Sequence, residues 1–367
     1  MEFLERIYAS LGEEGLKKAR WQTRMQVLGM TLQIVFVLLY VALWMLTPLS
    51  PRVAALTGEN PWLYTLVFFL GQSLFNLPLN YFSRWVELRL GTNRQSLSGW
   101  LLDWLKQSAV SVALMTLLFG GAYAVMRAWP EAAPLVFLVL VAAFAGLLYA
   151  LQPFFLRLEF KAEPLEDEAL AARIQKLFER AGVPFRGVYR LRAGEKTSRG
   201  NAAVIPKVGG HEVVFTDTLL EELDTEALAF VVAHELGHVK HRDTLRGLFA
   251  FAVLLYVALL AGYVLVGTPA LARFPLFYLG TQLAFVFGKL AMNHLVRTQE
   301  YAADRFAIRL VPDLEAFERS FLVLSRQNFG DPDPPAWIET LLHDHPSIKH
   351  RYQALKKALE ENNEGAA

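Results

Sequence analysis

The chain has 367 residues, of which 54% are hydrophobic, and its formal net charge at pH 7 is +1. A charge this close to zero argues against a nucleic-acid partner, because no basic surplus is available to neutralise phosphates. The absence of cysteine excludes disulfides, thiol nucleophiles and cysteine-based zinc sites, so a metal would have to be held by histidine, aspartate or glutamate.

The apolar residues gather into six stretches that could each cross a bilayer, since a spanning helix needs about 20 mostly apolar residues. They cover residues 27–49, 61–82, 108–129, 134–156, 247–267 and 274–294. The second also holds Gln72, Asn76 and Asn80, and polar groups in a span usually face a protein interior or a wet cavity. Six buried helices of a soluble protein are disfavoured, because such helices rarely run this long without charge. We expect a mainly α membrane protein with about six transmembrane helices.

Basic residues are dense on alternate sides of these stretches. Five precede the first stretch: Arg6, Lys17, Lys18, Arg20 and Arg24. Four more lie between the second and the third: Arg84, Arg89, Arg94 and Lys106. The first and fifth connections have one each, Arg52 and Arg273. Because short basic connections stay in the cytoplasm, this pattern predicts that both termini are cytoplasmic.

The spans divide the chain into four predicted segments. Residues 1–156 form an N-terminal membrane domain with four transmembrane helices, and residues 247–294 form a helical hairpin in the membrane. Residues 157–246 and 295–367 are the two soluble parts, and neither is large enough to bury a good core alone. We expect them to fold together as one cytoplasmic α+β domain with a small sheet.

A metal-binding motif stands in the first soluble part. Asp224 is a plausible N-cap for a helix that continues through an apolar run into His234, Glu235 and His238. Histidines four residues apart share one helical face and can bind one zinc ion, and the glutamate can act as general base toward a zinc-activated water. An amphipathic helix with solvated histidines is the alternative. The flanking valines favour a buried site instead.

The second soluble part offers a third ligand. Glu300 and Asp304 share one helical face directly after the sixth span, and the motif helix shortly precedes the fifth. The two spans could therefore bring both pieces to the same membrane surface. Asp304 is a candidate acceptor for a ligand imidazole N–H, and we group Arg297 with it as a supporting residue. A surface helix with ordinary charges at this spacing is the alternative.

The tail contains a weaker polar cluster, His345-Pro346 followed by Arg351. Taken from the residues alone, it is a weak signal. The remaining histidines are expected to be structural or solvated: His211, His241, His294, His343 and His350.

The chain resembles the type I CaaX prenyl proteases, membrane zinc endopeptidases related to bacterial heat-shock membrane proteases. Besides the metal motif, the resemblance rests on residues 85–93, 153–155, 164–165, 198–202, 213–220 and 342–351, and on Asp103 and Lys106. It implies membrane helices that enclose a wet chamber, with Zn²⁺ near its cytoplasmic side. It also implies that His234, His238 and Glu300 are the ligands.

The resemblance also implies roles in substrate binding. Asn201 and Ala202 would lie on an edge strand that pairs with an extended peptide substrate. His345 and Arg351 would sit by the open coordination position, where they could stabilise the oxyanion or hold the substrate backbone.

The sequence departs from the family in two ways. It has six expected spans, whereas the eukaryotic enzymes have seven, and Ser347 stands where the family has a second proline. Together with the lack of cysteine, the reduced span count favours a prokaryotic homologue in an inner membrane. Its substrate would be a peptide or protein, with a lipidated or membrane-embedded segment as one option.

Three other functions are weighed against a prenyl protease. A quality-control protease of the heat-shock type would keep the chemistry without prenyl specificity. An inactive membrane scaffold is disfavoured because His234, Glu235, His238 and Glu300 are all present. A transporter is disfavoured because the polar residues converge on a soluble site rather than on the bilayer midplane.

Overall fold

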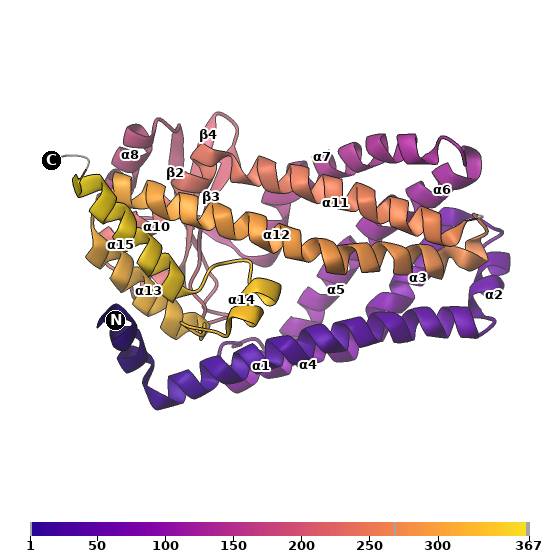
Figure 1. Ribbon diagram of the computed structural model, residues 1–367, viewed down its shortest axis with the longest axis horizontal. Coiled ribbons are helices and arrows are strands. Elements are labelled where there is room, and N and C mark those ends of the chain that lie inside the picture. Colours follow the sequence, from indigo (N-terminus) through magenta and orange to yellow (C-terminus); the bar gives the residue numbers. More distant parts are fainter. Residues whose placement is uncertain (1, 268, 365–367) are drawn as a thin grey trace.

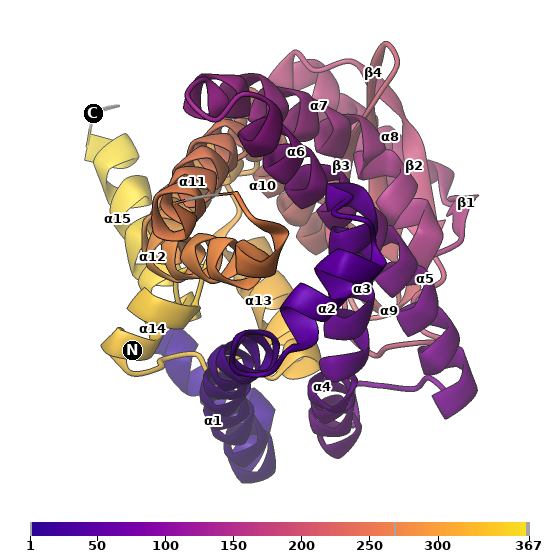
Figure 2. The same ribbon diagram turned by 90° about the vertical axis from the view of Figure 1, so that its right-hand side faces the viewer.

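The computed structural model describes residues 2–267 and 269–364. Residues 1, 268 and 365–367, which belong to the predicted first, third and fourth segments, lie outside the described residues. The molecule is elongated, with long helices at one end and a mixed α and β region at the other (Figure 1). Seen along the long axis, the helices are arranged in a ring (Figure 2).

The long helices include six that could span a membrane by length and composition. The first four candidates are Phe3–Leu46, Pro61–Leu90, Leu97–Ala128 and Ala133–Gln152, and the last two are Asp243–Val266 and Leu271–Leu310. The predicted count of six is therefore confirmed. The helices of this part are α1 (Glu2–Leu46), α2 (Leu49–Leu56), α3 (Pro61–Phe75), α4 (Leu77–Leu90), α5 (Leu97–Met115), the π-helical turn η1 (Thr116–Gly120), α6 (Gly121–Ala128), α7 (Ala133–Glu159), α11 (Asp243–Val266), the short η2 (Leu271–Arg273) and α12 (Phe274–Leu310).

Several helices extend beyond the predicted apolar stretches. Helix α1 begins at Glu2, well before residue 27, and α12 continues past residue 294 to Leu310. An apolar stretch marks only the part of a helix that could cross a bilayer, whereas the backbone hydrogen bonds of the helix can continue beyond it. The extension of α12 is what carries Glu300 and Asp304 out of the helical hairpin.

The other end of the molecule contains a small mixed sheet surrounded by helices. Its strands are β1 (Ala162–Pro164), β2 (Phe185–Leu191), β3 (Ala202–Lys207) and β4 (Gly210–Thr216). Their order is β1-β2-β4-β3, with β2 parallel to β4 and the other two pairs antiparallel. Strand β3 thus lies at an edge. The helices are α8 (Glu168–Ala181), α9 (Asp217–Leu220), α10 (Thr225–His241), α13 (Leu314–Asn328), α14 (Ala336–Leu342) and α15 (Ile348–Glu364). The predicted fold class is confirmed.

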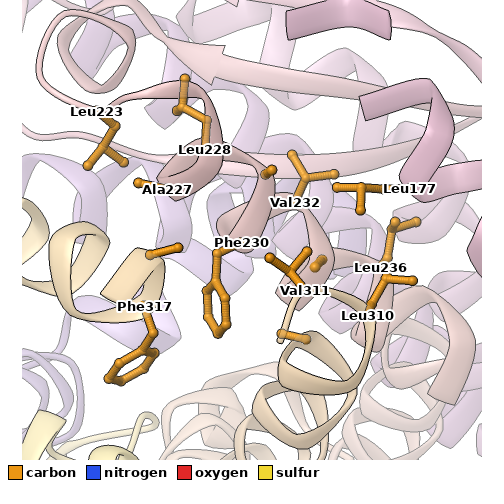
Figure 3. Packing of buried hydrophobic residues seen from close by; sticks show 14 of the residues in the cluster. Leu177, Leu223, Ala227, Leu228, Phe230, Val232, Leu236, Leu310, Val311 and Phe317 are labelled. Carbon is orange, nitrogen blue, oxygen red and sulfur yellow. The ribbon is translucent and has the colours of Figure 1, made fainter. Parts of the chain in front are cut away.

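Helix α10 runs through the middle of the soluble core. Its N-cap is Asp224, as predicted, and the carboxylate accepts a hydrogen bond from the Ala227 N–H at 2.9 Å. Figure 3 shows Leu228, Val232 and Leu236 of α10 beside residues of both soluble parts, and the Phe230 ring lies 5.6 Å from that of Phe317. Because this core joins residues 157–246 to residues 295–367, we propose that the two parts form one folding unit.

The start of α1 also belongs to this core. The sequence predicted these residues to be part of the N-terminal membrane domain, residues 1–156. Phe3 and Ile7 are buried in the soluble core, and the Phe3 ring lies 4.4 Å from the Tyr352 ring. Gly12, at φ 62°, interrupts the helix and lets the chain turn from the soluble core into the long membrane helix. Residues 2–11 therefore pack with the soluble domain, although they belong to the predicted membrane segment.

The polar residues of the second span line a cavity between the membrane helices. Gln72, Asn76 and Asn80 border a space of about 480 Å³ together with side chains of α1 and α5. Their position agrees with the expectation that polar groups in a span avoid lipid.

Candidate metal centre

The first two residues of the candidate site come from α10. His234 and His238 are one turn apart, and their Nε2 atoms lie 3.1 Å from each other. Helix α10 ends at His241, and Arg242 adopts a left-handed conformation at φ 56° before α11 begins. This turn aims Asp243, the first residue of α11, back at the site. Its Oδ2 lies 2.9 Å from His238 Nδ1.

The third residue comes from α12, which touches α10 beside the histidines. A Cβ atom on Gly237 would lie 2.8 Å from Ala303 Cα, so only glycine permits this approach. The contact brings Glu300 between the two imidazoles. Its Oε2 lies 3.4 Å from His234 Nε2 and its Oε1 lies 3.4 Å from His238 Nε2.

These three residues form a group that could hold a metal ion, with donor atoms within 4.8 Å of one another. Each imidazole directs Nδ1 at a carboxylate, Asp304 for His234 and Asp243 for His238, at 2.9 Å in both cases. If both Nδ1 atoms carry the proton, both Nε2 lone pairs face each other and face Glu300. Such a cluster of electron-pair donors favours a cation between them, either a proton, in agreement with the raised pKa of His234 described below, or a metal ion. Donors at 2.0–2.2 Å from a tetrahedral zinc ion would stand about 3.3–3.6 Å apart, and the observed spacing is close to that.

A buried charge network lies behind His234. Arg351 donates to both oxygens of Asp304, from Nε at 2.8 Å and from Nη2 at 2.6 Å. Its Nη1 lies 3.2 Å from Glu300 Oε2, and the guanidinium packs over the Phe321 ring at 4.5 Å. Asp304, Glu300 and Arg351 are all buried. The cation therefore offsets the desolvation of two carboxylates, and Asp304 in turn fixes the orientation of the imidazole.

The electrostatics of α10 follow from burial and from these carboxylates. Burial opposes protonation of His234, but hydrogen bonds to Asp304 and Glu300 outweigh it and raise its pKa to about 9. Burial raises the pKa of Glu235 above its ordinary value, although the two histidines act in the opposite direction. A carboxyl group with a raised pKa is suited to accepting and returning a proton near neutral pH.

A pocket of about 380 Å³ opens onto the group. Glu235, His345, Arg351, Asn201 and Ala202 all line it together with the three candidate ligands. His345 Nε2 lies 3.3 Å from Glu300 Oε1, and its Nδ1 lies 2.8 Å from Asp344 Oδ1. The structure therefore brings the predicted ligands, base and substrate-contacting residues to one place, with Asp304 directly behind His234.

The edge strand enters this pocket with a particular backbone orientation. The Asn201 carbonyl accepts from the Thr216 N–H at 2.9 Å, so Asn201 faces β4. The Ala202 N–H instead bonds to the Asn201 side-chain oxygen at 2.9 Å. Because successive residues of an edge strand alternate in the direction of their hydrogen bonds, Ala202 presents its backbone to the open side.

Arg297 supports the chain after α14. Its Nη1 donates to the backbone carbonyls of Glu339, Thr340 and His343, the last at 2.7 Å. It thereby satisfies the C-terminal end of α14 and supports the loop that carries His345. Its supporting role therefore concerns the loop between α14 and α15.

Two contacts were missed from the sequence. Asp243 holds His238, and the only available signal was an acidic residue five positions after a candidate ligand. His350, expected to be solvated, places Nδ1 3.0 Å from Glu339 Oε1. That pairing depends on how α14 and α15 meet, which no local pattern indicates.

Comparisons with known proteins find two family profiles that match the chain. A family profile described as "Peptidase family M48" matches residues 164–359, and one described as "CAAX prenyl protease N-terminal, five membrane helices" matches residues 5–157. Within the second range the described residues contain four candidate spans, one fewer than that description.

Individual relatives cover most of the chain. The uncharacterized metalloprotease YhfN of Bacillus subtilis is 28% identical over 318 residues, which cover 82% of this chain and 73% of that protein. The CAAX prenyl protease 1 homolog of Oryza sativa subsp. japonica is 25% identical over 337 residues, covering 83% and 76%. The crystal structure of S. mikatae Ste24p has a similar fold, with a TM-score of 0.81 at 20% identity over 94% of this chain and 89% of that one. The resemblance to CaaX prenyl proteases found in the sequence is thereby confirmed.

Proposed function

The chain belongs to peptidase family M48, and from that premise we propose that it is a zinc-dependent endopeptidase that hydrolyses peptide bonds from within a membrane. The observation that carries the proposal is the convergence of two imidazole nitrogens and a buried carboxylate, backed by Asp304 and Asp243, at the base of a pocket. The metalloprotease class follows from the family. The metal, the residue roles and the reaction are the proposal.

His234, His238 and Glu300 would hold the zinc ion, since imidazole and carboxylate ligands suit it and the chain has no cysteine. When bound, the ion acts as a Lewis acid and lowers the pKa of a coordinated water. Asp304 and Asp243 accept the Nδ1 protons and so keep both Nε2 lone pairs directed at the metal.

Glu235 would act as general base and then as general acid. It lines the pocket next to His234 without occupying the ligand positions. It takes a proton from the attacking water and later returns it to the leaving amine. Its raised pKa favours that exchange.

His345 would contact the substrate in the pocket, and Arg351 would act on it from the pocket wall. His345 is more than half exposed, with 57% of its side chain accessible, and can donate to a developing oxyanion or to the substrate carbonyl. Arg351 is committed to Asp304 through Nε and Nη2, so its influence on the substrate would be exerted mainly through its charge.

An extended peptide would bind along β3. Asn201 and Ala202, where β3 begins, line the pocket, and a peptide that adds to this edge gains main-chain hydrogen bonds without a sequence requirement. The Asn201 side chain would have to release the Ala202 N–H or bond to the peptide in its place.

The chain is an integral membrane protein, and we propose a prokaryotic inner membrane with both termini and the site on the cytoplasmic side. The basic residues before α1's apolar stretch and around α4 support this orientation. The start of α1 and helix α15 lie at the same end of the molecule (Figure 1).

The test compares wild type with Glu235→Gln, using the purified full chain in detergent. Removing a general base should lower hydrolysis by about 10²–10⁴-fold while bound zinc is unchanged. Glu226→Gln, on the first turn of the same helix, is the matched control and should retain activity. An active Glu235→Gln enzyme would contradict the assignment of the base.

The substrate class is tested separately. Some relatives bear the name CAAX prenyl protease, which makes a prenylated peptide the first substrate to try. A protease HtpX homolog of Helicobacter pylori is 31% identical over 166 residues, which cover 40% of this chain and 53% of that protein, and this similarity supports testing the quality-control alternative as well. Cleavage of an unprenylated unfolded protein at a rate equal to that of the prenylated peptide would favour that alternative.

A further inference from the structure

A second pocket lies between the first part of α1 and the end of α4. It shares no residue with the pocket at the candidate metal centre. Its volume is about 680 Å³. Apart from Glu14, every residue that lines it is basic or aromatic. These residues are Lys17, Lys18, Arg20, Trp21, Arg24, Trp85 and Arg89. We call it the basic cleft. Nothing in the proposed peptidase mechanism uses these residues.

The basic cleft is built from two regular helix faces. On α1, Lys17, Trp21 and Arg24 are spaced by four and three residues, so they share one face, with Arg20 beside them. On α4, Trp85 and Arg89 are four residues apart. The faces meet where the Trp21 and Trp85 rings pack edge to face, with centroids 5.9 Å apart. Figure 1 shows the two helices running alongside each other.

The charge of the cleft is unbalanced. Lys18 lies 3.2 Å from Glu14, and Lys17 lies 3.8 Å from Glu13, in pairs whose carboxylates are exposed. Exposed pairs of this kind contribute little, and their lysines can turn to another anion. Among the described residues, Arg20, Arg24 and Arg89 have no carboxylate partner, although Arg89 lies over the Trp85 ring at 5.5 Å. The cleft therefore presents a surplus of cations.

The cleft stands where the charged part of α1 gives way to its apolar part. Arg24 is the last basic residue of α1, and an exposed Leu28 follows one turn later. On α4, Leu88 is exposed beside Arg89, close to the end of the helix. Tryptophan rings at such a boundary usually lie at the level of the lipid headgroups. Cationic and apolar surfaces therefore adjoin in the order found in a phospholipid.

We propose that the basic cleft binds the phosphate headgroup of an anionic phospholipid, with the acyl chains against the apolar faces of α1 and α4. Basic pockets between membrane helices recognise anionic headgroups in this way. The arginines supply bidentate donors for phosphate oxygens, and the tryptophan pair forms the boundary with the hydrocarbon. A soluble phosphate or an acidic peptide would use the cations but not the exposed leucines.

The experiment uses native mass spectrometry of the full chain in detergent, with phosphatidylglycerol and phosphatidylcholine of identical acyl chains. Wild type should retain phosphatidylglycerol in preference. The triple variant Arg20→Gln, Arg24→Gln, Arg89→Gln should bind it about 100-fold more weakly, because each cation near an anionic surface changes affinity about fivefold. The triple variant with lysine at the same three positions keeps the charge and should retain the preference.

The matched control removes three exposed arginines elsewhere, Arg52→Gln, Arg180→Gln and Arg309→Gln, and should bind like wild type. Equal binding of the two lipids by wild type, or equal weakening in both glutamine variants, would overturn the proposal. Displacement of the lipid by inorganic phosphate or by polyglutamate at the same concentration would also overturn it, since the cleft would then take a soluble anion. The readout is lipid binding, so it does not depend on peptidase activity.

Discussion

The membrane part and the soluble part of helix α12 differ in the polar interactions that accompany their packing. In the membrane part, it packs against α11 through glycines, and a Cβ atom on Gly280 would lie 2.9 Å from Gly262 Cα. Around this contact the core is rich in aromatic rings, such as Phe68, Phe274 and Tyr278. Two hydrogen bonds there join neutral groups. The Tyr123 hydroxyl donates to the Ala270 carbonyl at 2.6 Å, and the Ser50 hydroxyl donates to the Ala272 carbonyl at 2.8 Å.

In the soluble part, α12 packs against α10 through Gly237, again by a close backbone approach. Here the buried polar groups are charged, because Glu300, Asp304 and Arg351 are paired within one network. The two parts of α12 should therefore differ in how well they tolerate substitution of a polar residue. A neutral hydroxyl can be removed from the membrane core at small cost, whereas a member of the charged network cannot be removed without leaving a charge unpaired.

The largest expected effect is that of Arg351→Met. It leaves two buried carboxylates without their cation, and breaking a buried pair costs about 3–5 kcal/mol. Chemical denaturation in mixed micelles should show this loss, whereas Arg180→Met, at an exposed position, should be near neutral. If the two variants were equally stable, the charged network would not hold α12 in place.

Asp243→Asn is expected to act on the metal with less effect on the fold. The amide still fits beside His238, but it lacks the negative charge that strengthens the hydrogen bond from Nδ1–H, and its NH2 group can only donate. Loss of such a partner lowers metal affinity by about 10–100-fold. Competition with a chelator measures this affinity, with Asp331→Asn as the control. Unchanged zinc affinity in Asp243→Asn would remove Asp243 from the site.

Tyr123→Phe should have the smallest effect. It removes one hydrogen bond to the connection between α11 and α12, and such bonds in membrane proteins contribute about 0.6 kcal/mol. The same denaturation assay applies, and Tyr149→Phe, at an exposed position, is the control. A loss as large as that of Arg351→Met would mean that the two regions do not differ in the way described.

Sequence patterns predicted the features that depend on local order. The six spans could be found because apolar length is a local property. His234 and His238 were predicted as ligands because their four-residue spacing places them on one helical face, with Glu235 on the neighbouring side. Glu300 was recognisable by its place just after the last span. The resemblance to a known family supplied Asn201, Ala202, His345 and Arg351.

Other features depend on contacts distant in the sequence. The bond between Arg351 and Asp304 joins α15 to α12, and the support that Arg297 gives to the tail joins α12 to α14. Asp243 faces the site because Arg242 adopts a left-handed conformation, which is unusual for a non-glycine residue. The four-residue spacing of Phe3, Ile7 and Leu11 indicates that residues 2–11 have an apolar face. The spacing does not indicate which surface that face packs against.

The most direct test of the account is the zinc content of the purified full chain. Wild type should bind about one zinc ion per chain. His234→Ala and Glu300→Ala should each lose most of it, because a catalytic zinc site usually has three protein ligands and each substitution removes one of the three in this group. His294→Ala and Glu226→Ala are the matched controls and should keep the metal, since both residues lie outside the group. Full zinc occupancy in folded Glu300→Ala protein would contradict the central claim that α12 completes the metal site of α10.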